Sequence, residues 1–266
     1  ASSGDTIRVA EGVYTENLLV DIDITLEGGY IPEGTLWLSR TGETIIDGAN
    51  NQPVWGAWDE KGIRYATVIT DDGGYKMWYI GLDRNEIGSI GYATSPDGIN
   101  WTKHTSNPVL DVGDEGKGDS QGLESPFVLK EDGIYKVWYA GLGTDDYWRT
   151  GYATSTDGIN WQKYDGNPVI DVGTQNWNNR MVHSPYIFQE DNLYKMWAHT
   201  VGDEGSGWTP YIAYGTSSDG IDWTWHRANP LFSRDPSHNW ESQWVWRPSV
   251  LHVGSGYQMW YSAGGD

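Results

Sequence analysis

The chain has 266 residues, enough to bury a sizeable core, and it contains no run of about 18 apolar residues that would span a membrane. Its formal net charge of −20 would repel nucleic-acid phosphates, which excludes nucleic acid as a partner. Because cysteine is absent, disulfides and thiolate metal sites are also excluded.

Residues 1–50 form a segment of their own, in which short aliphatic strands are separated by glycine turns. The pattern resembles the first coil of right-handed parallel β-helix proteins of the pectate-lyase type. One or two coils cannot enclose a solenoid core, so we expect the segment to pack on the following domain, on another chain or on another part of the protein.

Residues 51–266 contain a repeat with a period of about sixty residues. A Tyr-Ala/Gly-Thr-Ser-x-Asp-Gly-Ile-Asn/Asp-Trp segment begins at Tyr92, Tyr152 and Tyr214. A Tyr-x-x-Trp strand precedes each copy, and a fourth such strand begins at Tyr257. Short strands and turns at this period predict an all-β fold of propeller blades.

About three and a half blades are visible, whereas a closed ring needs at least four. Two explanations stay open. Either residues 1–50 complete the ring by strand pairing, or the ring is incomplete because the chain is a fragment of a longer protein with further domains.

The aspartates of the repeated turn are expected to be structural. The glycine permits a positive φ, and the carboxylate accepts backbone N–H groups across the turn. A carboxylate repeated in every full blade cannot mark one active site. The three residues are Asp97, Asp157 and Asp219.

The repeat resembles the five-bladed β-propeller glycoside hydrolases, the group of arabinanase, xylosidase and invertase-like enzymes. Tyr-Lys-Met-Trp-Tyr strands, the Asp-Gly-Ile-Asn-Trp turn and a following Asn-Pro-Val carry the resemblance. It covers about residues 51–266. It implies a five-bladed-type propeller and an oligo- or polysaccharide partner of plant or microbial origin, and we expect an extracellular or cell-surface location.

Aligning the blades on their Tyr-x-x-Trp strands predicts which residues meet in a shared pocket. The head of each inner strand holds a different residue, as expected where every blade contributes its own group: Arg64, Glu124, His183 and Trp246. The next residues are Tyr65, Ser125, Ser184 and Arg247, and five residues before the heads lie Asp59, Asp119, Asn178 and Glu241.

Glu124 stands in a Glu-x-Pro pattern that, by the resemblance, carries the general acid. An inverting enzyme needs a second carboxylate about 6.5–9.5 Å away to activate water. The family places aspartates at two other strand heads, where this chain has Arg64 and His183. Asp59 and Asp119 are the substitutes within this chain, and a further blade is the other source.

Other pocket residues are candidates for binding sugar. Arg64, His183 and Arg247 suit hydroxyls or the carboxylate of an acidic sugar, with structural ion pairs as the alternative. Trp246 lies beside them. Three tryptophans recur ahead of the inner strands and either stack on sugars or pack within the blades: Trp58, Trp177 and Trp240.

Three functions stay open. The first is a glycoside hydrolase-like propeller with Glu124 as general acid. The second is a non-catalytic carbohydrate-binding or surface-interaction propeller. The third is a structural fragment of a β-helix–propeller protein. No cofactor or metal site is expected, although a structural cation near the propeller axis stays open. The sugar, the linkage and the retaining or inverting outcome stay open as well.

Overall fold

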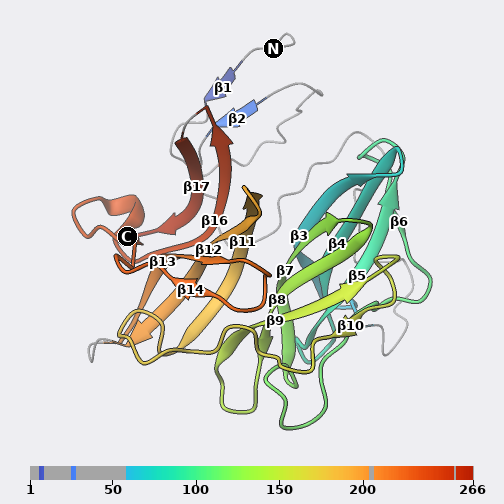
Figure 1. Ribbon diagram of the computed structural model, residues 1–266, viewed down its shortest axis with the longest axis horizontal. Helices are drawn as coiled ribbons and strands as arrows, with labels where there is room; N and C mark the ends of the chain where they lie inside the picture. Colours follow the sequence, from blue (N-terminus) through green and yellow to red (C-terminus); the bar gives the residue numbers. More distant parts are fainter. Residues whose placement is uncertain (1–5, 9–24, 28–57, 204–206, 255, 266) are drawn as a thin grey trace. The chain divides into compact units, whose positions relative to one another are not determined.

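A computed structural model describes residues 6–8, 25–27, 58–203, 207–254 and 256–265 (Figure 1). The chain divides into two compact units, Ala1–Asp47 and Gly48–Asp266. In the first unit, β1 (Thr6–Arg8) pairs in parallel with β2 (Thr25–Glu27). The rest of the predicted β-helix-like segment, its packing and the predicted boundary at residue 50 lie outside the described residues.

The second unit is all-β, as the repeat predicted, and neighbouring strands within each blade pair antiparallel. We number four blades in chain order. Blade 1 comprises β3 (Gly62–Asp71), β4 (Gly74–Leu82), β5 (Gly88–Ser95) and β6 (Thr102–Lys103). Blade 2 comprises β7 (Gly122–Glu131), β8 (Ile134–Leu142), β9 (Trp148–Ser155) and β10 (Gln162–Lys163).

Blades 3 and 4 follow the same order. Blade 3 comprises β11 (Met181–Glu190), β12 (Leu193–Asp203), β13 (Trp208–Ser217), β14 (Thr224–Trp225) and the extra strand β15 (Phe232–Ser233). A 3-10 turn, η1 (Asn239–Glu241), leads into blade 4, which consists of β16 (Trp244–Val253) and β17 (Gly256–Gly264). None of the described residues form a helix with the length and apolarity needed to cross a bilayer.

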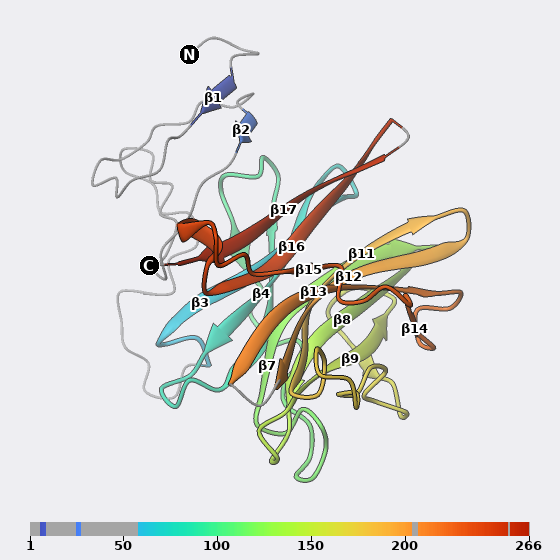
Figure 2. The same ribbon diagram turned by 90° about the vertical axis from the view of Figure 1, so that its left-hand side faces the viewer.

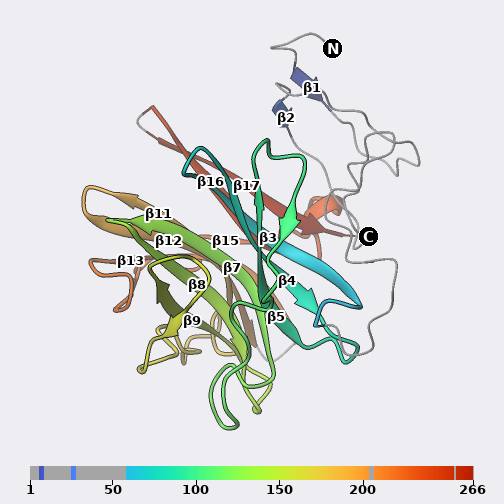
Figure 3. The same cartoon turned by 90° about the vertical axis from the view of Figure 1, so that its right-hand side faces the viewer.

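The first strands of successive blades lie next to one another. Strand β7 lies between β3 and β11, and β11 contacts β16, as the three views show (Figures 1, 2 and 3). A single parallel pair, Met181 with Trp148, links blades 2 and 3 into one sheet. The all-β propeller-type fold is therefore confirmed, and the heads of the inner strands come together.

The repeated Asp-Gly turn closes each full blade. In blade 2, Asp157 Oδ1 accepts hydrogen bonds from the backbone N–H groups of Ile159 at 2.8 Å and Asn160 at 2.7 Å. Gly158 takes a φ of 77°, which favours glycine. Asp97 and Asp219 make the same backbone bonds in their own blades. These contacts agree with the predicted structural role.

The same turn also joins neighbouring blades. The buried Trp78 of blade 1 donates from Nε1 to the Gly158 carbonyl of blade 2 at 2.8 Å. Trp138 of blade 2 donates to the Gly220 carbonyl of blade 3 at 2.7 Å. A Cβ atom on Gly158 would lie 2.8 Å from the Trp78 ring, so a side chain there would push the blades apart. Glycine therefore serves both the turn and the blade contact.

A polar cluster, which we call the interblade clamp, repeats at three blade junctions. In the first, Lys76 pairs with Asp71 of its own blade and donates to Tyr135 Oη of the next blade at 2.7 Å. The Tyr135 hydroxyl donates to Asp71, so all three groups have partners. The other two clamps consist of Lys136, Glu131 and Tyr194, and of Lys195, Glu190 and Tyr257.

Candidate functional site

Every inner strand has a β-bulge near its head. Strand pairing shifts register there, and the bulged residue takes a left-handed backbone although it is not glycine. Such backbone costs about 1–3 kcal/mol per residue and is concentrated at functional sites. The residues and their φ angles are Tyr65 (51°), Ser125 (46°), Ser184 (48°) and Arg247 (53°).

The bulges bring side chains of four blades together in what we call the inner-strand cluster: Arg64, Tyr65, Glu124, Ser125, His183, Ser184, Trp246 and Arg247. At its centre is Glu124, which is 9% exposed. One carboxylate oxygen accepts a hydrogen bond from Arg64, and the other lies 3.0 Å from His183 Nε2. Three strand heads that the alignment placed in one pocket are thus in direct contact.

A hydroxyl pair supports the imidazole of His183. Its Nδ1 lies 2.6 Å from Ser184 Oγ, which is 3.0 Å from Ser125 Oγ. The edge of the Trp148 ring approaches the imidazole, with the ring centres 5.1 Å apart. The sequence analysis did not select Trp148. Its position at the start of the third strand of its blade could have indicated that it lies near the strand heads.

Blade 4 meets blade 1 through Arg247. Its guanidinium donates to the Tyr65 hydroxyl and lies 4.4 Å from the centre of the Tyr65 ring and 5.2 Å from that of Trp246. The buried His199, which sequence reasoning also missed, packs 5.6 Å from Trp246. Burial and the electrostatic interactions with His183 and Arg247 hold the pKa of His199 well below its usual value, so this ring is neutral at pH 7.

The contacts of Glu124 decide its charge. Burial raises the pKa of its carboxyl, but the hydrogen bond from His183 and the electrostatic interactions with His183, Arg64 and Arg247 together outweigh burial. The pKa of Glu124 therefore lies below its ordinary value, and the carboxylate is ionised at neutral pH. As a carboxylate, Glu124 can act in the free protein as a base or as a fixed negative charge that anchors a ligand.

Asp59 and Asp119, the proposed water-activating partners of Glu124, have different neighbours. Asp59 pairs with Lys103 of β6 at 2.7 Å, and Asp119 pairs with Lys163 of β10 at 2.6 Å. Asp119 also accepts a hydrogen bond from Tyr139 at 2.9 Å. Each carboxylate ties the loop before an inner strand to the outermost strand of the same blade. This repeated anchor favours a structural role over the catalytic one.

The three recurrent tryptophans pack within their own blades. A Cβ atom on Gly81 would lie 2.1 Å from the Trp58 ring, so this indole lies directly on the backbone of β4. The Trp177 ring meets Trp225 edge-on at 5.3 Å, and Trp240 lies 5.9 Å from Tyr261. These contacts favour packing for Trp58 and Trp177, whereas Trp240 is 48% exposed and keeps open both roles that the sequence allowed.

Among the described residues, one group has the spacing of metal ligands. Atoms of Asp235, His238 and Glu241 lie within 4.8 Å of one another. Asp235 accepts a hydrogen bond from the Ser237 hydroxyl at 2.7 Å and lies 2.8 Å from His238 Nδ1. The group is thus already bonded internally, and the sequence had not singled it out for metal.

Comparison with known proteins gives the family. The model of the glycosyl hydrolases family 32 N-terminal domain matches residues 66–244. An uncharacterized protein of Mycobacterium tuberculosis is 32% identical over 136 residues, which is 49% of this chain and 44% of that protein. A 1,2-β-oligomannan phosphorylase of a Thermoanaerobacter species is 34% identical over 116 residues, 40% of this chain and 38% of that enzyme. The chain thus spans less than half the length of these relatives.

Solved structures show the same fold. A protein described as a glycoside hydrolase has a TM-score of 0.68 at 16% identity, covering 83% of this chain and 69% of its own. The fructan 1-exohydrolase IIa of Cichorium intybus has a TM-score of 0.58 at 18% identity, covering 77% and 40%. Because these identities are low, the likeness concerns the fold alone. Because this family model matches residues 66–244, the chain belongs to the glycosyl hydrolases family 32, N-terminal domain.

Proposed function

We propose that the inner-strand cluster binds a sugar chain around a glycosidic bond. On this proposal Glu124 donates the proton to the leaving oxygen when the bond is cleaved. The observation that carries the proposal is the contact of Glu124 with both Arg64 and His183, each from a different blade. A family of glycosyl hydrolases supplies the reaction class. A polysaccharide substrate would place the protein outside the cell.

Cleavage requires a proton on the leaving oxygen, which the ionised Glu124 lacks in the free protein. The Arg64 side chain is 40% exposed, so a bound sugar has access to it. A sugar that displaces Arg64 and excludes water removes one positive charge and increases burial, and both changes raise the pKa of Glu124. On this proposal Glu124 becomes the general acid when substrate is bound.

The attacking group is water or phosphate. Two relatives bear phosphorylase names, 1,2-β-oligomannan phosphorylase and β-1,2-mannobiose phosphorylase. Arg64 and Arg247 offer guanidinium groups that suit phosphate oxygens. An assay with and without inorganic phosphate therefore distinguishes hydrolysis from phosphorolysis.

A non-catalytic sugar-binding domain is the second candidate. Among the described residues, Glu124 is the one carboxylate in the inner-strand cluster, and its pKa is lowered. Asp59 and Asp119 are each paired with a lysine of their own blade. A single ionised carboxylate can accept hydrogen bonds from sugar hydroxyls. The described residues of the cluster then offer no second carboxylate that could activate water.

The test is an incubation of the chain with arabino-, xylo-, fructo- and 1,2-β-manno-oligosaccharides, with and without phosphate. Glu124→Gln keeps the side-chain shape and removes the titratable proton, so turnover should fall about 10²–10⁴-fold while sugar binding persists. Glu86→Gln is the matched control, since Glu86 is exposed and pairs with Lys61.

Each outcome separates the candidates. Binding without cleavage by the wild-type chain would establish the non-catalytic domain. Cleavage that survives Glu124→Gln would refute the role of Glu124. If no oligosaccharide is bound or cleaved, both candidates are wrong.

A further inference from the structure

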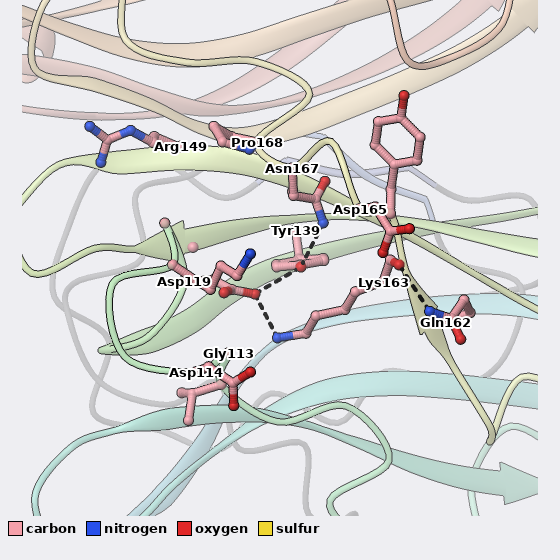
Figure 4. Close-up of a pocket in the computed structure, with 16 residues that line it drawn as sticks. Gly113, Asp114, Asp119, Tyr139, Arg149, Gln162, Lys163, Asp165, Asn167 and Pro168 are labelled. Atoms are coloured by element: carbon pink, nitrogen blue, oxygen red, sulfur yellow. Dashed lines mark hydrogen bonds and ion pairs between the residues drawn. The ribbon is translucent and has the colours of Figure 1, made fainter.

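A pocket of about 560 Å³ lies in blade 2, apart from the inner-strand cluster (Figure 4). Its lining comes from the loop before β7, from β8 and β9, and from β10 with the turn that follows it. It shares no lining residue with the inner-strand cluster. Neither the proposed cleavage nor the structural anchors of the blade explain why space is left here.

The repeat explains how the pocket arises. Trp58, Trp177 and Trp240 occupy one position of the repeat, and in blade 2 that position holds Gly118. In blade 1, Cβ atoms built on Gly81 and Gly91 would lie 2.1 and 2.3 Å from the Trp58 ring. Their counterparts in blade 2, Gly141 and Gly151, line the pocket instead. The pocket thus occupies the place that an indole fills in blade 1.

The anchoring residues beneath this space are the same in both blades. Asp119 accepts from Lys163 at 2.6 Å and from Tyr139 at 2.9 Å, as Figure 4 shows. Asn167 Nδ2 donates to Tyr139 Oη at 3.3 Å. Blade 1 has Asp59, Lys103, Tyr79 and Asn107 at these positions. Blade 2 therefore has the same scaffold as blade 1, although it lacks the indole.

The rim of the space differs between the two blades. Where blade 1 has the short side chains of Ser89, Thr102 and Thr105, blade 2 has Arg149, Gln162 and Asp165, and all three of these line the pocket. Two long polar side chains, Arg149 and Gln162, and one added carboxylate, Asp165, are thus present in the blade that lacks the indole. This combination is what a ligand site needs: a vacated ring-sized space with hydrogen-bonding groups around its edge.

We propose that the blade 2 pocket is a second binding site, for a neutral sugar ring of an oligosaccharide. The lining contains three acidic and three basic side chains, so its formal charge is zero. Two of the basic groups are already paired, Lys163 with Asp119 and Arg149 with Asp145 and Asp171. An ionic ligand would have to break these pairs.

A sugar ring leaves these ion pairs in place. Its hydroxyls both donate and accept, which matches the amide of Gln162 and the carboxylate of Asp165. The exposed Tyr164 side chain adds aromatic surface to the lining. The site binds sugar independently of any cleavage at Glu124.

The decisive variant is Gly118→Trp, which installs the indole of the other blades. Gly118 does not have a left-handed backbone, and its Cβ would lie 3.5 Å from Arg149 Cδ and 3.8 Å from Pro168 Cδ, ordinary contact distances. Gly118→Ala is the matched control, because one methyl group leaves the pocket open. Circular dichroism and thermal melting establish that each variant is folded.

Titration calorimetry with xylo-, fructo- and 1,2-β-manno-oligosaccharides measures the effect. We expect Gly118→Trp to weaken one binding event at least about tenfold, and Gly118→Ala to preserve it. Should Gly118→Trp fail to fold, the double variant of the exposed residues, Gln162→Ala with Asp165→Ala, should weaken the same event. Arg64→Ala in the inner-strand cluster should leave this event unchanged, which separates the two sites.

Three results would overturn the proposal. The first is that all sugar binding is unchanged in Gly118→Trp and in the double variant. The second is that none of the oligosaccharides binds to the wild-type chain. The third is that 3-methylindole occupies the pocket while sugars do not, which would assign the space to an aromatic group.

Discussion

At the scale of the residue, the charge of Glu124 depends on the guanidinium beside it. Arg64 donates to the carboxylate and helps to lower its pKa. Replacing Arg64 with Met removes this charge while retaining a long side chain, so the pKa of Glu124 should rise. Nuclear magnetic resonance of ¹³C-labelled glutamate would measure the shift. A pKa that stays the same or falls in Arg64→Met would contradict the electrostatic account.

Sequence reasoning succeeded at the residue scale where the repeat supplied the geometry. The alignment predicted that Arg64, Glu124 and His183 share a pocket, and the structure brings them into contact. The lysine partners of Asp59 and Asp119 were not predicted. Lys103 lies 44 residues from Asp59, and the register of a two-residue outer strand sets this contact.

At the scale of the element, the presence of each inner strand was easier to predict than the residues at which it begins and ends. Read back from the Tyr-x-x-Trp strands, the sequence predicts inner strands at 65–70 and 249–253, whereas the strands span Gly62–Asp71 and Trp244–Val253. Each of these strands has a β-bulge, and its extra residue shifts the pairing register of the part that precedes it. The part of each strand before the bulge, which carries the site residues, is the part that the expected ranges left out.

The contact between a second-strand tryptophan and the next Asp-Gly turn is open to a direct test. Trp138→Phe removes the hydrogen bond to the Gly220 carbonyl and leaves a cavity in a fully buried site. We expect a loss of about 2–3 kcal/mol in the free energy of unfolding. Chemical denaturation measures it. Trp208→Phe is the control, since Trp208 is 66% exposed and should change stability little. Equal losses in the two variants would contradict the assigned role.

At the scale of the whole unit, the interblade clamps make stability depend on pH. The hydrogen bonds from Lys136 and Tyr194 lower the pKa of Glu131 from 4.5 to about 2, and those from Lys130, Lys76 and Tyr135 hold the pKa of Asp71 well below its usual value. Because these folded-state pKa values are depressed, the clamps stabilise the fold fully above about pH 4.5. Their contribution is lost as the pH falls toward about 2.

Thermal melting between pH 5 and pH 2 tests this dependence. The melting temperature should fall across that range, and it should fall less steeply in Glu131→Gln, which no longer titrates at this position. Glu86→Gln at the exposed surface serves as the control for the substitution itself. A melting temperature that is flat or rises on acidification of the wild-type chain would refute the clamp as a source of stability.

The central claim is that sugar binds at Glu124, where the inner strands of the blades converge. The most direct measurement is a crystal structure of the Glu124→Gln variant with a bound oligosaccharide, because this variant should bind without turnover. We predict a sugar ring within hydrogen-bonding distance of the side chain at position 124 and of His183. Sugar bound elsewhere, with the inner-strand cluster unoccupied under saturating ligand, would contradict the account.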